Sequence, residues 1–375
     1  MLRIGIQLDM IGGYGREVLR GLMGYANRVG NWEFVLPPMY SPRRAHTFAS
    51  GSIDGLVAMV HDARTLRPYR RTGVPVVNVA RTLDDHMLAE LELPSVLPDD
   101  QAIGRTAFNY FKDRGFRRFA FCGHPTVAWS RARERAFVTA AESIGQACAT
   151  VHVADAVPPD WLRGLPRYTA LLAANDRYAW LAVDACRDLG IRVPEDVAVL
   201  GVDNDSLLTD MARPTLSSIG PASFNVGYEA GRVLSHLLQG GRVSPVPRLV
   251  EPAGVVTRHS TDVLVIDDTA VQAAARFIRE HATEPISIAD VVDAAATGRR
   301  TLERRFKASL GRSLHDELRR VRVERAMQLL RDTSLDIPTV AERSGFSGHA
   351  RFSTVFRQAT GATPTDFRRQ VRLEG

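Results

Sequence analysis

The chain carries a helix–turn–helix pattern in residues 337–358, which read IPTVAERSGFSGHARFSTVFRQ. The first half of this stretch has apolar residues at the spacing of one buried helix face, namely Ile337, Val340 and Ala341. A tight turn follows at Gly345, and we expect Ser347 to cap a second helix over residues 348–358. That helix would bury Phe352 and Phe356. The stretch therefore predicts two short packed helices, and the second is a candidate recognition helix.

A second copy of the pattern lies upstream, between residues 286 and 310. Ser287 is placed to cap a helix whose buried face comprises Ile288, Val291, Val292 and Ala295. After a turn at residues 296–298, the pattern predicts a helix from Arg299 to Leu310 that buries Leu302 and Phe306. A longer helix between Leu314 and Arg331 separates the two copies and would set their spacing.

The exposed faces of both candidate recognition helices suit duplex DNA. A major groove accepts one helix, and arginine there can pair with guanine O6 and N7 while other cations hold phosphates. The first helix would present Arg299, Arg300, Glu303 and Arg304. From the second copy, the candidate contacts are Ser347, His349, Ala350, Arg351, Ser353, Thr354 and Arg357, with the arginines placed on phosphates.

The net charge of the chain is concentrated in the same region. Residues 269–375 hold 19 Arg and Lys against 13 Asp and Glu, which accounts for the whole net charge of +6. Residues 1–268 hold 29 residues of each sign and are neutral. A basic surplus confined to one helical region favours nucleic-acid binding there.

Several glycine and aromatic residues at fixed offsets make the region similar to the AraC/XylS family of bacterial transcription regulators. The resemblance is carried by residues 302–307 (LERRFK), by Ala326 with Leu329-Leu330, by Val340-Ala341 through Gly345-Phe346-Ser347, and by Phe352, Phe356, Gly361, Pro364 and Phe367-Arg368. It covers essentially all of residues 269–375. It implies that the two recognition helices enter successive major-groove segments about one helical turn apart.

The remainder of the chain alternates short apolar runs with helical patterns. The predicted strands are Ile4–Leu8, Gly55–Val60, Val74–Val79, Arg118–Cys122, Thr169–Ala173 and Val197–Val202. The helical segments between them include Gly15–Val29, Ala102–Arg114, Arg133–Ile144 and Ala179–Leu189. This rhythm is typical of doubly wound α/β sheets with buried parallel strands. Ligands of such sheets bind beyond the carboxyl ends of the strands.

Composition changes near residue 263, where a stretch rich in glycine and proline ends. We therefore expect a domain over 1–262 and a second domain over 263–375, all helical in pattern. Three cysteines without a CxxC pair, Cys122, Cys148 and Cys186, argue against a disulfide framework and a zinc site, and favour a reducing cytoplasm. The first residues lack the apolar run of a signal peptide, and no stretch has the apolar length of a membrane span.

Polar residues that follow three of the predicted strands suggest a small-molecule site. They occur in residues 129–137 (WSRARERAF), 173–176 (AAND) and 201–204 (GVDN). These stretches resemble the sugar-binding core of lactose-repressor-type regulators and periplasmic pentose-binding proteins, which implies ligand-binding roles for Arg133, Asn175 and Asp203. Such side chains offer directed donors and acceptors to sugar hydroxyls. Trp129 or Tyr14 could stack on the sugar ring.

A sugar-binding core in front of an AraC-type region resembles the xylose operon regulators as a family. Tyr14 with Arg16, residues 201–205 (GVDND) and residues 258–262 (RHSTD) add to the match. The resemblance implies D-xylose as the ligand and activation of pentose catabolism. We further expect a homodimer, with promoter DNA and RNA polymerase as its partners. Asp9 belongs to a first loop less polar than in relatives, and Pro221 replaces a frequent glutamine. A different monosaccharide, with the protein acting as a repressor, therefore remains the alternative.

An enzyme is the other alternative, through a dinucleotide loop at Gly13-Tyr14-Gly15. The third glycine of that motif and the lysine of a phosphate-binding loop are both missing, so a tight turn explains the glycines better. Residues 203–205 lack the glycine and distal glutamate of an EF-hand. We expect no catalytic residues, no metal and no cofactor. A secreted sugar-binding protein is disfavoured by the basic helical region.

Overall fold

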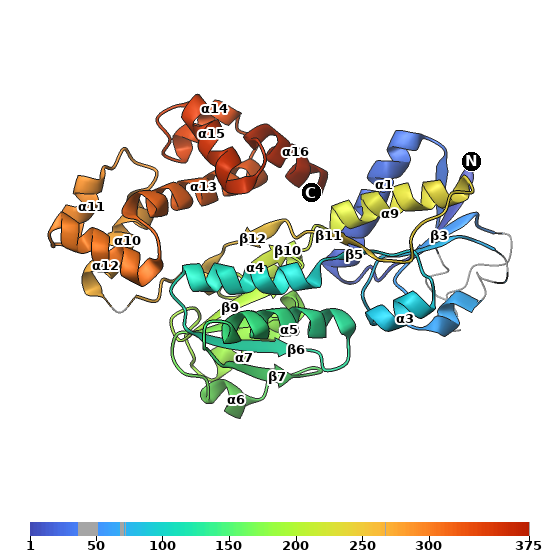
Figure 1. Cartoon of the computed structure of the whole chain (residues 1–375), viewed down its shortest axis with the longest axis horizontal. Coiled ribbons are helices and arrows are strands. Elements are labelled where there is room, and N and C mark those ends of the chain that lie inside the picture. Colours follow the sequence, from blue (N-terminus) through green and yellow to red (C-terminus); the bar gives the residue numbers. More distant parts are fainter. Residues whose placement is uncertain (37–51, 68–70, 72, 267, 375) are drawn as a thin grey trace. The chain divides into compact units, whose positions relative to one another are not determined.

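The computed structural model of the chain describes residues 1–36, 52–67, 71, 73–266 and 268–374 (Figure 1). It divides into two compact units. The α/β unit comprises Met1–Tyr110 and Arg117–Asp262, and the helical unit comprises Phe111–Phe116 and Val263–Leu373.

The first lobe of the α/β unit is built on a parallel sheet in the order β2-β1-β3-β4. Its strands are β1 (Leu2–Gln7), β2 (Trp32–Val35), β3 (Gly55–Ala58) and β4 (Val76–Asn78). Its helices are α1 (Gly13–Val29), the short α3 (Asp85–Glu90) and, from much later in the chain, α9 (Ser223–Leu238); η1 (Ala63–Leu66) is a single 3₁₀ turn. Helices α1 and α9 lie side by side (Figure 1), because Gly21 and Gly227 let their backbones touch. A Cβ at Gly21 would lie 1.9 Å from the carbonyl oxygen of Phe224.

The second lobe is built on a six-stranded sheet in the order β12-β10-β9-β8-β6-β7. Its strands are β6 (Arg118–Gly123), β7 (Cys148–His152), β8 (Thr169–Ala173), β9 (Val197–Val202), β10 (Ser217–Gly220) and β12 (Gly254–Val256). Its helices are α4 (Asp100–Asp113), α5 (Ala128–Glu142), α6 (Pro159–Arg163), α7 (Asp176–Asp188) and α8 (Ser206–Met211), with the 3₁₀ turn η2 (His259–Thr261). Strands β8 and β9 are buried along their whole length, as their apolar sequences require.

The two lobes are joined where β5 (Val96–Pro98) pairs in parallel with β11 (Arg248–Val250). The chain passes between the lobes after β5, after β10 and again between β11 and β12. Each passage leaves from a strand end, so the space between the lobes is lined by the loops that follow the strands.

The predicted fold class is confirmed, with two corrections. Strand β12 runs antiparallel to β10, so the second sheet is mixed rather than purely parallel. Six strands were not predicted, namely β2, β5, β7, β10, β11 and β12. They are three to five residues long, and β7 is half-exposed, so it lacks the continuous apolar run that identifies a buried strand.

The helical unit contains two helix–turn–helix repeats with separate apolar cores. The first repeat comprises α10 (Thr269–His281), α11 (Ile288–Ala294), α12 (Arg299–Leu310) and the first half of α13 (Leu314–Asp332). The second repeat comprises the second half of α13 with α14 (Ile337–Arg343), α15 (His349–Thr360) and α16 (Pro364–Glu374). Among the described residues after Val263 there is no strand.

Helix caps agree with the sequence in the first repeat and differ in the second. Ser287 caps α11 in a capping box with Asp290, as predicted for Ser287. The prediction that Ser347 caps the second recognition helix is wrong. The N-cap of α15 is Gly348, so no side chain caps this helix. The helix begins at His349, one residue later than the pattern indicated. No helix in the described part of the chain is both long and apolar enough to cross a membrane.

Candidate functional site

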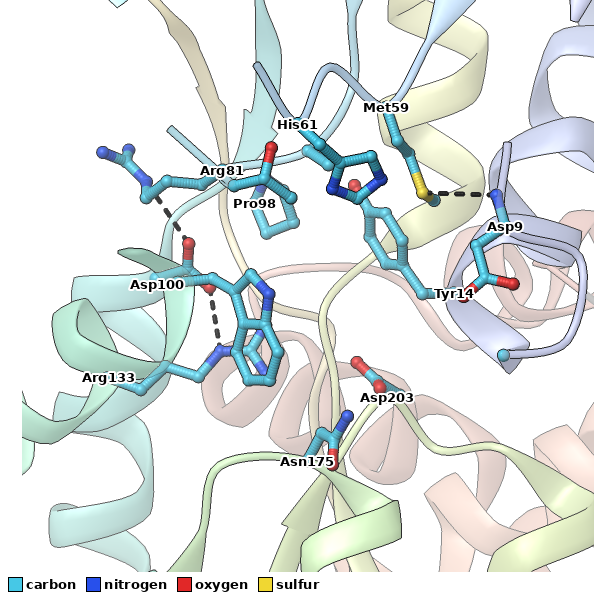
Figure 2. A pocket seen from close by; sticks show the side chains of 15 residues that line it. Asp9, Tyr14, Met59, His61, Arg81, Pro98, Asp100, Arg133, Asn175 and Asp203 are labelled. Carbon is cyan, nitrogen blue, oxygen red and sulfur yellow. Dashed lines mark hydrogen bonds and ion pairs between the residues drawn. The ribbon is translucent and has the colours of Figure 1, made fainter. Parts of the chain in front are cut away.

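A cavity of about 200 Å³ lies between the two lobes of the α/β unit. This volume is far more than a single bound water requires, and it suits a ligand of monosaccharide size. It is lined by Asp9, Gly12, Tyr14, Gly15, Met59, His61, Ala80, Arg81, Thr82, Pro98, Asp100, Trp129, Arg133, Asn175 and Asp203 (Figure 2). Six of the seven predicted ligand-binding residues are among them, and Arg16 is not.

Most polar lining residues stand just beyond the carboxyl end of a strand or on the helix that follows it. In the first lobe, Asp9 follows β1, His61 follows β3 and Arg81 follows β4. In the second lobe, Arg133 lies on the helix after β6, Asn175 follows β8 and Asp203 follows β9. Parallel strands bring these ends to one edge of a sheet. The two edges face each other across the cavity, so a bound molecule would touch both lobes.

A buried charge cluster forms one wall of the cavity. The Nε of Arg133 donates to a carboxylate oxygen of Asp100 at 2.8 Å, and the Nη1 of Arg133 donates to the carbonyl of Ala174 at 2.6 Å. The other oxygen of Asp100 lies 3.3 Å from the Nε of Arg81. Burial raises the pKa of Asp100, and the charges of Arg133 and Arg81 oppose this rise. The centre of a Trp129 indole ring lies 4.9 Å from the guanidinium carbon of Arg133, which adds a cation–π contact to the cluster.

Asp203 contributes a carboxylate with unusual titration behaviour. It follows β9 with φ of 114°, a conformation uncommon outside glycine, and the turn directs its side chain toward the cavity (Figure 2). Burial is the main reason that the pKa of Asp203 is raised to about 7, with Asp100 and Asp205 adding to the rise and Arg133 opposing it. The neighbouring Asp176 is buried, and its pKa is also raised, mainly by burial. Near neutral pH the Asp203 carboxyl therefore exists both as the protonated acid, which can donate a hydrogen bond, and as the carboxylate, which can only accept one.

Tyr14 and Asn175 each use one polar group in a hydrogen bond to the main chain of the protein. The hydroxyl of Tyr14 donates to the carbonyl of Val79, and burial raises the pKa of this phenol. The Oδ1 of Asn175 caps α7 by accepting from the amide of Tyr178 at 3.2 Å. The amide nitrogen of Asn175 points toward the cavity (Figure 2).

Arg16 has a different position from the one predicted. Its guanidinium pairs with both oxygens of Asp205 at 3.0 and 3.1 Å and donates to the carbonyls of Met10 and Ile11. The first turn of α1 thus directs Arg16 to Asp205 instead of the cavity. Asp205 also accepts from the amide of Gly13 at 2.9 Å. Since Asp205 belongs to the second lobe and Gly13 to the first, these contacts tie the lobes together.

The tight turn predicted at Gly13-Tyr14-Gly15 has a steric explanation. A Cβ at Gly15 would lie 1.9 Å from the carbonyl oxygen of Asp9, and one at Gly13 would lie 2.8 Å from the Asp205 side chain. Both glycines permit close approach of protein groups.

Sequence reasoning missed Asp100, His61 and Arg81. His61 and Arg81 follow predicted strands, so the rule that ligands bind at carboxyl strand ends could have identified them. Asp100 follows β5, a strand of three residues that was not predicted. Its signal was the pair Asp99-Asp100 before a helical pattern, since acids are favoured in a first helical turn.

The two recognition helices present contrasting surfaces. On α12, Leu302 and Phe306 are buried, and the predicted DNA contacts Arg299, Arg300, Glu303 and Arg304 are all exposed. The Nε of Arg299 donates to Glu303 at 2.9 Å along the helix. This face carries three arginines and a carboxylate, a chemistry suited to phosphates and guanine edges.

On α15, Phe352 and Phe356 are buried, and the exposed surface mixes two arginines with His349 and small uncharged residues. The predicted residues Ser347, His349, Ala350, Arg351, Thr354 and Arg357 are exposed, and Ser353 is half-buried. The hydroxyl of Thr354 donates to the carbonyl of Ala350 at 3.1 Å, so its hydrogen is used within the helix while its oxygen can still accept. Methyl and hydroxyl groups can contact thymine methyls and base edges.

Comparisons with known proteins agree with both parts of the chain. Residues 108–261 match the family model for a periplasmic binding protein-like domain, and residues 291–370 match that for a helix-turn-helix domain. The xylose operon regulatory protein of Escherichia coli (strain K12) is 30% identical over 98% of this chain and 96% of its own length. That of Haemophilus influenzae is 29% identical over 95% of each.

A solved structure of a xylose-binding transcription activator superposes with a TM-score of 0.62 at 29% identity and covers 98% of both chains. These relatives are transcription regulators rather than enzymes. The resemblances inferred from the sequence are confirmed. The chain belongs to the family of the xylose operon regulatory proteins, and it is a sugar-responsive, DNA-binding transcription regulator.

Proposed function

We propose that this protein is a D-xylose-responsive activator of pentose catabolic genes. The observation that carries the proposal is the cavity between the lobes, which has the volume of a monosaccharide and is lined by polar side chains from both sheets. The names of the full-length relatives supply the sugar, because they are xylose operon regulatory proteins.

The ligand-binding residues in this proposal are Asp9, Tyr14, Trp129, Arg133, Asn175 and Asp203. Asp9 and Asp203 would accept hydroxyl protons, while Arg133 and the Asn175 amide would donate. Trp129 offers an apolar ring face for the C–H groups of the sugar. Because these residues come from both lobes, a sugar held by all of them stabilises the closed lobes over the open ones. Sugar can shift that equilibrium only through this difference in affinity.

The DNA-binding part of the proposal uses both recognition helices. A homodimer in the cytoplasm would place α12 and α15 of each chain in successive major-groove segments of a promoter and engage RNA polymerase from there. The exposed arginines of α12 and the basic surplus of residues 269–375 support this role.

Calorimetric titration with D-xylose, L-arabinose, D-ribose and D-glucose tests the sensor. We expect saturable binding of D-xylose at one site per chain and weaker binding of the others. The matched test of the output is a gel shift with DNA from upstream of the protein's own gene, at one fixed salt concentration. The shift should depend on D-xylose.

The outcomes separate the alternatives. Tighter binding of another monosaccharide would replace xylose but keep the regulator, and release of DNA on sugar binding would make it a repressor. Absence of binding to every sugar, or equal binding to unrelated duplexes, would refute the proposal.

A further inference from the structure

Among the described residues of the helical unit, one helix, α13, contributes side chains to the apolar cores of both repeats. Val321 of α13 packs against the core of the first repeat, while Val323 is buried in the core of the second. Arg322 lies between them. It therefore occupies the point on α13 where one core ends and the other begins.

Arg322 bonds to the main chain of the first repeat with two donors. Its Nε donates to the carbonyl of Ala282 at 2.7 Å, and its Nη2 donates to the carbonyl of Glu284 at 2.9 Å. Ala282 is the C-cap residue of α10, where helix carbonyls have no partner within the helix, and Glu284 lies in the turn that follows and also accepts from the amide of Ile286. Bonds from a charged donor are stronger than neutral ones. The fork therefore holds α13 to the end of α10.

The second repeat reaches the same point through the turn between α14 and α15. Gly345 in this turn has φ of 81°, which favours glycine. A Cβ at Gly345 would lie 2.1 Å from the carbonyl oxygen of Ala282 and 2.8 Å from the Nε of Arg322. The end of α10, the middle of α13 and the start of the second recognition helix thus meet at one guanidinium.

Arg322 is held by hydrogen bonds to uncharged main-chain carbonyls, and the charged neighbour that affects its pKa is a cation. Burial lowers the pKa of Arg322, and the nearby charge of Arg351 on α15 lowers it further. The hydrogen bonds found for its guanidinium are to main-chain carbonyls. A main-chain carbonyl fixes both distance and direction, so the fork restrains how the repeats can turn about α13.

We infer that Arg322 is a positioning residue that fixes the separation of α12 and α15, and thereby the spacing of the two DNA half-sites that the protein accepts. Without the fork, the repeats remain connected by the α13 backbone and the Gly345 contact, and the recognition helices sample several separations. The inference rests on the proposed reading of DNA by both helices and adds the residue that sets their spacing.

The first test measures the separation without DNA. Spin labels carried on noncanonical amino acids at the exposed positions Lys307 on α12 and Gln358 on α15 report the distance between the helices in the full chain. Arg322→Met keeps an unbranched apolar stem out to the position of Nε and removes both donors. We expect one narrow distance distribution for the unmodified protein and a clearly broader one for Arg322→Met. An unchanged distribution would overturn the inference.

The second test measures the spacing preference on DNA. Operator fragments carry the two half-sites at their natural spacing or with one base pair added or removed. We expect the unmodified protein to prefer the natural spacing by about tenfold, within the range of a single unfavourable base pair, and Arg322→Met to lose most of that preference. It should bind a fragment with one half-site as the unmodified protein does.

Arg325→Met is the matched control, because it removes one cation from the same helix and its Nη1 bonds only within α13, to Gln328. It should weaken binding to all fragments alike and keep the preference. A general loss of stability would lower the melting temperature and the folded fraction without changing the ratio of affinities. Should Arg322→Met fold poorly, Arg322→Gln retains one donor and should lose part of the preference.

The results distinguish the inference from the proposed function. Failure of the unmodified protein to bind any operator specifically would refute the proposed function, while the spin-label distances would still decide the role of Arg322. Specific binding with an intact spacing preference in Arg322→Met would overturn the inference alone.

Discussion

The cleft and the first recognition helix each contain an ion pair of nearly the same length in opposite surroundings. Arg133 and Asp100 lie 2.8 Å apart, and their side chains are 5% and 1% exposed. Arg299 and Glu303 lie 2.9 Å apart, and their side chains are 63% and 45% exposed. When one partner of a buried ion pair is removed, the other charge stays buried without water to solvate it. When one partner of an exposed pair is removed, water solvates the charge that remains. Distance alone therefore does not tell how much either pair matters.

The buried pair should give the largest effect when broken. Arg133→Ala leaves Asp100 buried with Arg81 as its remaining ion-pair partner, so we expect a loss of about 3–5 kcal/mol in the free energy of unfolding. The same change should abolish the sugar response in calorimetry and gel shift, with DNA binding in the absence of sugar nearly intact. Arg131→Ala, at an exposed position of the same helix, is the control. A sugar response equal to that of the unmodified protein would refute the cavity assignment.

A double variant sharpens this prediction. Adding Asp100→Asn to Arg133→Ala removes the stranded charge, so the double variant should be more stable than the sum of the two single changes predicts. Additive losses would mean that the pair is not coupled.

The raised pKa of Asp203 predicts that the free energy of unfolding depends on pH. The folded chain keeps this proton up to a pKa of about 7, while an unfolded aspartate releases it near 4. Between these values the folded state binds more protons, so the contribution of Asp203 to the free energy of unfolding falls as pH rises. Asp203→Asn should therefore raise the melting temperature of the sugar-free protein more at pH 8 than at pH 5.

Asp160→Asn provides the comparison for this titration, since the Asp160 side chain is 98% exposed. The difference in melting temperature between this variant and the unmodified protein is measured at the same two pH values as a control for removing an exposed carboxylate. An equal gain for Asp203→Asn at pH 5 and pH 8 would show that Asp203 titrates normally.

On the recognition helix, a single exposed arginine should have a moderate effect that is visible only with DNA. If Arg304 reads a base, Arg304→Ala should cost about 1–3 kcal/mol at one position and relax the preference there. If Arg304 holds a phosphate, the change should weaken binding to all sequences and reduce the slope of affinity against salt by about one. Binding to a set of single-base operator variants at two salt concentrations separates these results. No change in either measure would remove Arg304 from the interface.

The exposed pair itself should give the smallest effect. Glu303→Gln removes the ion pair with Arg299 and should change the free energy of unfolding in urea by less than about 0.5 kcal/mol. A loss comparable to that of Arg133→Ala would show that exposure does not distinguish the two pairs.

Much of the fold could be predicted because its central strands are buried on both faces. The strands at Thr169–Ala173 and Val197–Val202 have the bounds that their apolar runs indicate, and Arg299–Leu310 has those of its helical pattern. The short edge and linking strands escaped because three residues carry no periodicity. Asp100 was missed for that reason, since it depends on β5.

The remaining differences at the site concern side-chain direction, which periodicity does not encode. Arg16 directly follows Gly15, which lines the cavity, but the Arg16 side chain is directed to Asp205 in the other lobe. Serine is a residue type that often caps helices, but α15 begins after Gly348, so Ser347 lies one residue before the N-cap position. Both depend on contacts or dihedral angles set by the three-dimensional structure.

The first half of helix α13 packs in one core and the second half packs in the other. This arrangement limits where residues can be inserted into or deleted from the helical unit. One residue inserted into a helix rotates everything after it by about 100° and advances it by about 1.5 Å. Such an insertion between Val321 and Val323 would move one core out of register with the other. Natural insertions and deletions should therefore accumulate in the loops of the helical unit, while α13 keeps a constant length during evolution.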